Sequence, residues 1–128
     1  MMIENNLPPT TISSDLHGDF NTYHDFSKLD YSLAGAFNRL IGLGLPIQDA
    51  IKCVTYAPAS ILKSSHEIGT LAEGSTADFT ILDQRDEPLV MSDAEGQKLQ
   101  IPGALVPIFV YKNGKKFETD PTMFPDLS

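Results

Sequence analysis

The sequence has little cysteine, little positive charge and no long apolar run. Cys53 is the single cysteine among 128 residues, so no disulfide can form within the chain, as is usual in a reducing cytosol. Lys and Arg number 9 against 17 Asp and Glu, and the formal net charge of −8 disfavours contact with a phosphate backbone. The sequence contains no run of about eighteen apolar residues, which is the length that a membrane-spanning helix needs. These absences predict a cytoplasmic protein that binds neither nucleic acid nor a membrane.

Short motifs that carry chemistry are also scarce. The sequence contains no glycine-rich phosphate loop, no His-x-His, no Cys-x-x-Cys and no Gly-x-Ser-x-Gly. Its length is ordinary for one domain, but a complete eight-stranded β/α barrel needs about 250 residues. The chain could therefore hold only part of such a barrel.

Residues 1–66 are predicted to be mainly helical, after one short strand. A β-branched stretch precedes an irregular loop, and apolar residues then recur at spacings of three and four, which is typical of amphipathic helices. Proline is expected to break the second helix. The predicted elements are a strand over 10–15, a loop over 18–30, and helices over 31–41, 46–57 and 58–62.

Residues 67–128 change to the period of two that is typical of strands. Asn113 and Gly114 both tolerate positive φ, which predicts a tight hairpin that pairs residues 106–111 with residues 115–118. The other predicted strands cover residues 77–83, 89–91 and 98–101. The fold class is therefore predicted to be α+β, with a helical part before an antiparallel part.

Asp15, His17 and His24 are the candidate chemical residues. A carboxylate at the end of a strand, before a long loop, lies where barrel enzymes place catalytic groups, although such an Asp often only caps a turn. Along a strand, Asp15 and His17 would face the same side and could bind a metal. Zinc needs three or four protein ligands, however, so His24 and Asp25 would have to join from the loop, where a histidine is more often simply exposed. His66 is expected to have no chemical role.

Two longer motifs carry a resemblance to a known family. Thr55-Tyr56-Ala57-Pro58-Ala59 is followed by Gly69-Thr70-Leu71, Gly74 and Ala77-Asp78. Over residues 8–118, the order of these pieces resembles the carboxyl-terminal portion of the amidohydrolase superfamily, in its dihydroorotase-like and deacetylase branch. The resemblance implies the last strand and helices of a β/α barrel over residues 1–66. It also implies that residues 67–128 form part of a small antiparallel β-sandwich, the composite domain of these enzymes, which is followed by a carboxyl-terminal tail.

The resemblance also implies an activity, hydrolysis of a C–N bond in a small-molecule amide or cyclic amide. Asp15 matches the family's catalytic and metal-binding aspartate, and His17 and His24 become candidates for substrate binding. A divalent metal, zinc, would be the cofactor of the complete enzyme. The family's other metal ligands lie in barrel strands that precede this segment, so the chain alone is expected to bind no metal and to be inactive.

Two other interpretations stay open. The chain could be a non-catalytic interaction module, or one half of a split enzyme, with its exposed barrel face covered by a partner chain or by a second copy. It could also be a small self-sufficient metalloprotein that uses Asp15, His17 and His24 as ligands.

Overall fold

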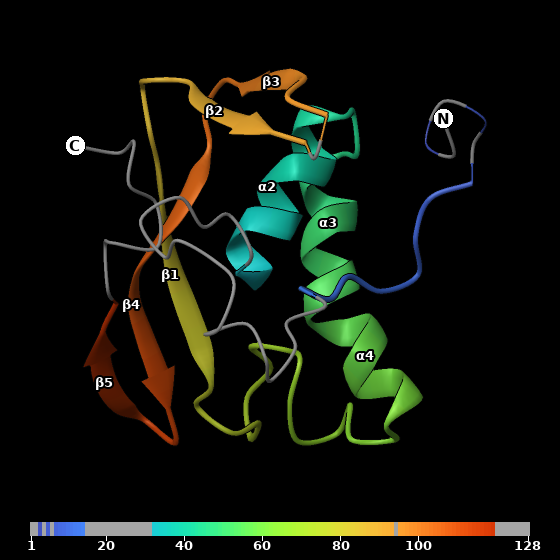
Figure 1. Cartoon of the computed structure of the whole chain (residues 1–128). Coiled ribbons are helices and arrows are strands. Elements are labelled where there is room, and N and C mark those ends of the chain that lie inside the picture. The colour runs from blue at the N-terminus through green and yellow to red at the C-terminus, as the bar shows by residue number, and fades with distance from the viewer. Residues whose placement is uncertain (1–2, 4, 6, 15–31, 94, 120–128) are drawn as a thin grey trace, which may run out of the picture.

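The computed structural model describes residues 3, 5, 7–14, 32–93 and 95–119. Within these residues the helices come first in the chain and the strands follow, which is the predicted mixed content (Figure 1). The elements are α2 Leu33–Gly42, α3 Ile47–Val54, α4 Tyr56–Ile61, β1 Phe79–Gln84, β2 Leu89–Ser92, β3 Lys98–Ile101, β4 Leu105–Lys112 and β5 Lys115–Glu118.

Helix α2 begins and ends with ordinary capping interactions. The Ser32 hydroxyl accepts a hydrogen bond from the Gly35 N–H at 3.0 Å, which satisfies one of the free amides of the first turn. After the helix, Gly44 has a φ of +99°, a conformation that glycine adopts without strain. The chain then turns back into α3, as the glycines and Pro46 predict.

The break between α3 and α4 lies at Thr55, whereas the sequence predicted it at Pro58. Thr55 has φ −126° and ψ −88°, which interrupts the helical path. Pro58 is the third residue of α4. In the first turn of a helix the missing proline N–H removes no hydrogen bond, so Pro58 is accommodated inside the helix that it was expected to begin.

Residues 10–14 do not form the predicted strand. The N–H of Ile12 donates a hydrogen bond to the carbonyl of Cys53 in α3, at 3.2 Å. A β-branched sequence needs a neighbouring strand to complete a ladder, and this segment lies against a helix instead. The rest of the predicted strand, Asp15, lies outside the described residues.

The strands form a three-stranded antiparallel sheet in the order β1-β4-β5 and a separate β2-β3 pair. The predicted hairpin is confirmed, because β4 pairs with β5 across Asn113 and Gly114, whose φ angles are +50° and +75°. The pairing of β1 with β4 shifts its register between Ile81 and Leu82. Strand β1 is paired on one side only within the part of the chain that the structure describes.

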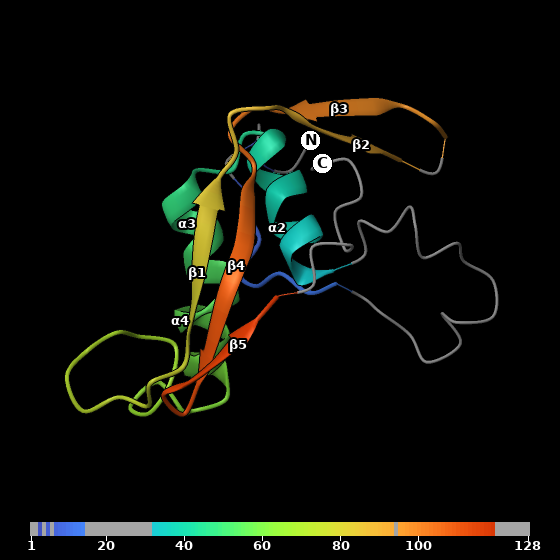
Figure 2. The same cartoon turned by 90° about the vertical axis from the view of Figure 1, so that its left-hand side faces the viewer.

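The helices lie on one side of the three-stranded sheet, and the β2-β3 pair crosses one end of it (Figure 2). Phe37, Leu45, Ala50 and Leu105 form one buried cluster, which joins the helices to β4. A second cluster lies under the β2-β3 pair and contains Leu89, Met91, Ile101, Ala104 and Val106. The division of the chain at residue 66 stays a prediction.

A buried polar side chain, Asn38, also joins α2 to β4. Its Nδ2 donates to the carbonyl of Leu105 at 2.7 Å, and its Oδ1 accepts from the N–H of Leu105 at 2.8 Å. Asn38 has no exposed surface. These bonds satisfy both backbone groups of Leu105 at the point where β4 begins.

Candidate functional site

The three candidate residues, Asp15, His17 and His24, lie outside the described residues. The structure does describe the chain on both sides of them. Residues 7–14 lead directly to Asp15, and α2 begins at Leu33 after its cap, Ser32. The frame of the candidate site is therefore defined by how these two flanks are held.

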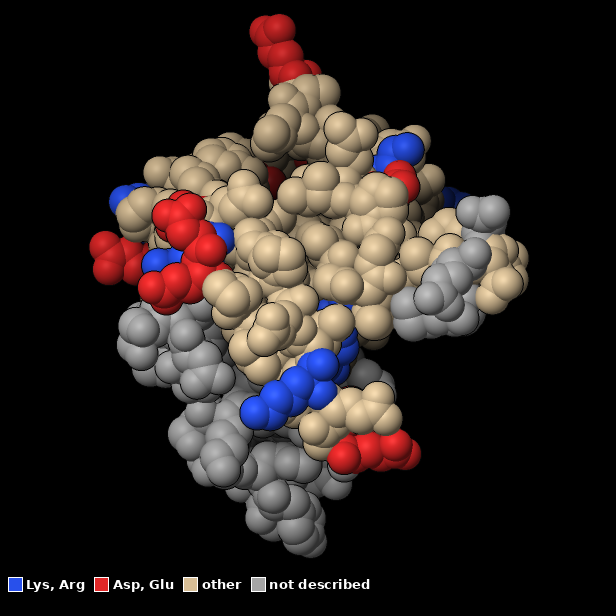
Figure 3. All heavy atoms as spheres, turned by 90° about the horizontal axis from the view of Figure 1, so that it is seen from above, with Lys and Arg blue, Asp and Glu red and all other residues tan. Residues whose placement is uncertain are grey.

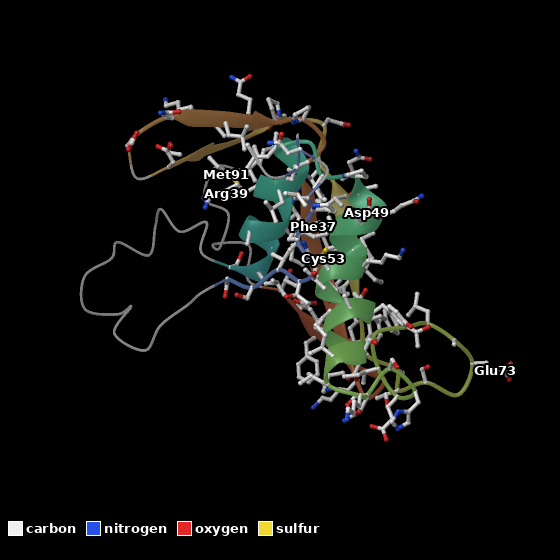
Figure 4. The ribbon with its side chains drawn as sticks, turned by 90° about the vertical axis from the view of Figure 1, so that its right-hand side faces the viewer. Phe37, Arg39, Asp49, Cys53, Glu73 and Met91 are labelled. Carbon is white, nitrogen blue, oxygen red and sulfur yellow. The ribbon has the colours of Figure 1, made fainter. Side chains whose placement is uncertain are left out.

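The first flank is held by Cys53, on the side of α3 that faces α2 (Figure 4). The Cys53 thiol donates to the carbonyl of Pro9 at 3.2 Å, and the Cys53 carbonyl accepts from the N–H of Ile12 at 3.2 Å. Burial, and then the nearby charge of Asp49, raise the pKa of the thiol above its ordinary value. The thiol is therefore protonated at neutral pH and can act as the donor.

The second flank, α2, is attached to the same core as the first. Phe37 on α2 is buried in the cluster with Leu45, Ala50 and Leu105, and Ile12 packs against this cluster from the other flank. Both ends of the segment that carries Asp15 are thus fixed to one hydrophobic cluster.

The interpretation of Cys53 as a small buried hydrophobe was incomplete. The residue is buried, with 5% of its surface exposed, as predicted. Its two hydrogen bonds to residues 9 and 12 were not predicted. No local pattern connects positions that lie more than 40 residues apart, and only the folded chain brings them together.

No group of three or more His, Cys, Asp or Glu that could hold a metal ion is present among residues 32–93, 95–119 and the described part of the amino-terminal segment. His66 lies on the surface with 72% of its side chain exposed, and its Nε2 is 3.4 Å from a carboxylate oxygen of Glu67. The described residues therefore do not form a metal site by themselves, and we assign them no step that passes through a metal.

The Ala77-Asp78 motif fastens the start of β1 to the β4-β5 turn. One carboxylate oxygen of Asp78 accepts from the N–H of Asn113 at 2.7 Å, and the other forms an ion pair with Lys112. The N–H of Gly114 donates to the carbonyl of Ala77 at 2.9 Å. These contacts give the motif a structural role at the end of the sheet that holds the β4-β5 turn.

The Asp78 contacts predict loss of stability in acid. The bond from the Asn113 N–H and then the Lys112 ammonium lower the pKa of Asp78 below its ordinary value, because both stabilise the carboxylate. A carboxylate whose pKa is lower in the folded chain stabilises the fold above its unfolded pKa, and this contribution disappears as the pH falls through the folded pKa. Unfolding by urea should therefore show a steeper loss of stability with acidification in the native chain than in an Asp78→Asn variant. Equal slopes below pH about 4 would contradict this assignment.

The described Lys and Arg side chains form no continuous basic surface on the face seen from above (Figure 3). Lys and Arg groups are scattered among Asp and Glu groups near the rim, and uncharged residues cover the middle. None of the helices in the described part of the chain is both long and apolar enough to cross a membrane.

Comparison with known proteins identifies the family. The sequence model of the Amidohydrolase family matches residues 8–115. A deacetylase of Brucella anthropi is 38% identical over 94 residues, which cover 73% of this chain and 22% of that protein. A deacetylase of Agrobacterium fabrum is 33% identical over 94 residues, with the same two shares covered.

Two solved structures contain the same fold. An adenine deaminase superposes with a TM-score of 0.76 and 23% identity, over 92% of this chain and 31% of that one. A dihydroorotase superposes with a TM-score of 0.73 and 24% identity, over 93% and 30%. The chain spans about a fifth of the length of the curated relatives it matches, 22% in each case. By its sequence match over residues 8–115, the chain belongs to the amidohydrolase family.

Proposed function

We propose that these residues form the carboxyl-terminal part of a metal-dependent enzyme that hydrolyses a C–N bond in an amide or cyclic amide. The observation that carries the proposal is the family match over residues 8–115, which includes Asp15, the Gly69-Thr70-Leu71 motif and Gly74. The two relatives named deacetylases support hydrolysis of an acyl group, and an acetyl group carried on nitrogen would offer a C–N bond of this kind. Residues 68–118 serve as structural support.

Asp15 acts as a proton acceptor and donor in this proposal. Its carboxylate takes a proton during attack of water on the substrate and passes it to the leaving nitrogen, which is the usual work of a general base and acid. A divalent metal, zinc in the first instance, would supply activated water in the complete enzyme. Asp15 would be one of its ligands, and residues outside this segment would provide the others. His17 and His24 contact the substrate.

This proposal predicts that the isolated chain neither hydrolyses amides nor binds zinc tightly. One carboxylate does not hold a metal that requires three or four protein ligands. Calorimetric titration with zinc should give no stoichiometric site of sub-micromolar affinity. N-acetylated amino acids and dihydroorotate should be hydrolysed at the rate of a blank. A tight zinc site that disappears on alanine replacement of Asp15, His17 and His24 would favour the self-sufficient metalloprotein instead.

Activity should appear when the missing part is supplied. We expect hydrolysis of an N-acetylated substrate when this chain is combined with the residues of the Brucella anthropi deacetylase that it does not match, expressed as a second polypeptide. In that complex, Asp15→Asn should lower kcat at least about a hundredfold, because a general acid-base is removed. His17→Gln and His24→Gln should mainly raise KM. An active complex with unchanged kcat in Asp15→Asn would contradict the assigned role.

A second candidate function is that of an interaction module, or one half of a split enzyme. The observation that favours it is the free edge of β1. Its side chains are exposed along the whole strand, including Phe79 at 37% and Ile81 at 39%. The opposite edge strand, β5, carries Lys115 and Lys116, and edge lysines discourage pairing with another strand. Strand β1 carries no lysine, and Asp83 is its one charged side chain, so this edge suits a strand of the complementary amidohydrolase segment on a neighbouring polypeptide.

This candidate predicts that the isolated chain self-associates. An exposed apolar edge recruits other strands, so size-exclusion chromatography should show species larger than a monomer. Leu82→Lys in β1 should shift the population toward monomer, because a charged lysine on an edge opposes pairing. Leu71→Lys, an exposed apolar position outside the strands, is the control and should change little. A native chain that elutes only as a monomer would count against the interaction module.

A further inference from the structure

The backbone groups along the outer edge of β1 can be assigned a direction from the bonds that its neighbour β4 makes. Strand β1 lies at the margin of the three-stranded sheet, and β4 is the one strand paired with it in the described chain (Figure 2). In an antiparallel pair, residues that exchange hydrogen bonds with the neighbouring strand alternate with residues whose N–H and C=O point away from it.

Gln84 belongs to the second class, with its backbone groups directed away from β4. The N–H of the next residue, Arg85, donates to the carbonyl of Ala104 at 2.9 Å, so Arg85 faces β4. Gln84 itself lies opposite Leu105, and both backbone groups of Leu105 bond to the Asn38 side chain instead. The pair of Gln84 and Leu105 is therefore one without hydrogen bonds between the strands.

Leu82 and Thr80 follow the same rule. Leu82 lies opposite Pro107, which has no N–H and whose carbonyl accepts from the Thr119 hydroxyl at 2.7 Å. The register shift next to Leu82 places its extra residue, Ile108, on β4. A bulge disrupts the strand that carries the extra residue, so β1 continues its alternation and Thr80 also points outward.

The edge thus presents a row of backbone donors and acceptors at Thr80, Leu82 and Gln84. None of the residues that the structure describes bonds to these groups. The side chains of β1 are exposed along the whole strand, so an added strand can reach the row. Extended peptides bind to sheet edges of this kind through their main chains, and the side chains decide which peptide fits.

The charge of Asp83 selects the strand that fits this edge. Asp83 is exposed and forms no ion pair within the described chain, and Asp86 and Glu87 follow it closely. In an antiparallel addition, Asp83 and Ile81 would lie in pairs without hydrogen bonds, where opposite side chains are closest. Opposite charges and apolar partners stabilise such pairs, whereas like charges oppose them. A second copy of this chain shares the net charge of −8 and has no basic residue in β1.

We propose that the edge of β1 binds an antiparallel strand of another polypeptide, with a lysine or arginine opposite Asp83 and an apolar residue opposite Ile81. The inference rests on the second candidate function and names the strand that this interaction module accepts. Self-association of the isolated chain uses the same backbone groups. A basic strand displaces the second copy, because it brings an opposite charge to Asp83.

Amide hydrogen exchange of the full 128-residue chain, followed by NMR, tests the proposal. The probe is the acetylated and amidated peptide Thr-Lys-Val-Ile-Thr, whose lysine stands opposite Asp83 when its valine pairs with Leu82. The peptide should slow exchange of the N–H groups of Thr80, Leu82 and Gln84 by at least about threefold, because each gains a hydrogen bond. The N–H groups of Asp83 and Arg85 already face β4 and should stay within about twofold of their rates in the free chain.

Two altered peptides are the matched controls. Glutamate in place of the lysine should weaken binding about threefold to tenfold, because it sets a like charge opposite Asp83. The protein variant Asp83→Lys should reverse this order and prefer the glutamate peptide. Methylation of the valine nitrogen removes the donor to the Leu82 carbonyl and should abolish the slowing of exchange. This change leaves the protein untouched, so a loss of binding is not a loss of folding.

Three results would overturn the proposal. They are unchanged exchange at Thr80, Leu82 and Gln84 with the peptide at its solubility limit, equal slowing at all five amides, and equal affinity for the lysine and glutamate peptides. Slowing that depends on protein concentration alone, and that the peptide does not alter, would assign the edge to a second copy instead. None of these measurements needs turnover or self-association. A monomeric, inactive chain that shows the alternating pattern would therefore count against the proposed functions and leave this edge assigned.

Discussion

Replacing Asn38 by leucine is expected to lower the free energy of unfolding by about 3–5 kcal/mol, because two buried backbone groups lose their partners at about 1–3 kcal/mol each. The Asn38 side chain bonds to both the N–H and the carbonyl of Leu105, at 2.8 and 2.7 Å. Leu105 is itself buried, with 8% of its surface exposed, so water cannot readily replace these bonds. Leucine preserves much of the volume but offers neither donor nor acceptor.

Urea unfolding measures this effect, with Gln48→Leu as the control on the exposed surface of α3. The control should change the free energy of unfolding by less than about 0.5 kcal/mol. Asn38→Asp isolates the donor, because aspartate keeps an acceptor for the Leu105 N–H but turns a second oxygen toward the Leu105 carbonyl. It should therefore be as destabilising as the leucine variant at neutral pH. A loss below about 1 kcal/mol in Asn38→Leu would show that water or a shift of β4 compensates for the missing bonds.

Much of the secondary structure could be predicted because its signals are local. The spacing of Leu33, Phe37 and Leu40 identifies α2, and the Asn113-Gly114 pair identifies the β4-β5 hairpin. Each depends on residues within one or two turns of one another, where backbone preferences act directly. The break between α3 and α4 lies at Thr55, and its prediction at Pro58 was wrong, because proline is compatible with the first turn of a helix as well as with its end.

The contacts that define the frame of the candidate site could not be predicted. Asn38 reaches Leu105 across 67 positions of sequence, and Cys53 reaches Pro9 across 44. A polar residue in an amphipathic helix usually faces solvent, and nothing local distinguishes Asn38 from such a residue. The position of β1 at the edge of the sheet could not be predicted either, because period-two alternation does not say which strand lies at the edge.

The candidate residues themselves came from family resemblance more than from physical pattern. Asp15 at a strand end has several ordinary roles, and the matched family supplies the reason to prefer a catalytic one. The strand expected to carry it is not formed by residues 10–14 in this chain. A strand needs a neighbouring strand to complete its ladder of hydrogen bonds, and the described neighbour of residues 10–14 is helix α3.

Gly69 lies at a close approach between two parts of the backbone, and Gly69→Ala is expected to cost about 3 kcal/mol. Its φ of +80° lies in the region where a Cβ costs about 1–2 kcal/mol. An added Cβ would also lie 2.8 Å from the carbonyl oxygen of Thr55 and 2.8 Å from the Cβ of Ala59. The Thr55 oxygen accepts a bond from the Ala59 N–H at 3.2 Å, so moving it away disturbs the start of α4.

Gly74→Ala is the matched control, because Gly74 has a φ of +90° but no atom within 4 Å of an added Cβ. It isolates the backbone term and should cost about 1–2 kcal/mol, measured as the free energy of unfolding in urea. The difference between the two variants reports the contact with Thr55 and Ala59. Equal losses would mean that the loop moves away from α4 without resistance, and that the Gly69-Thr70 motif serves only to turn the chain. A larger loss in Gly69→Ala would instead assign this glycine to the packing of the loop against the helix, the feature that joins the helical and antiparallel parts of the chain at this end.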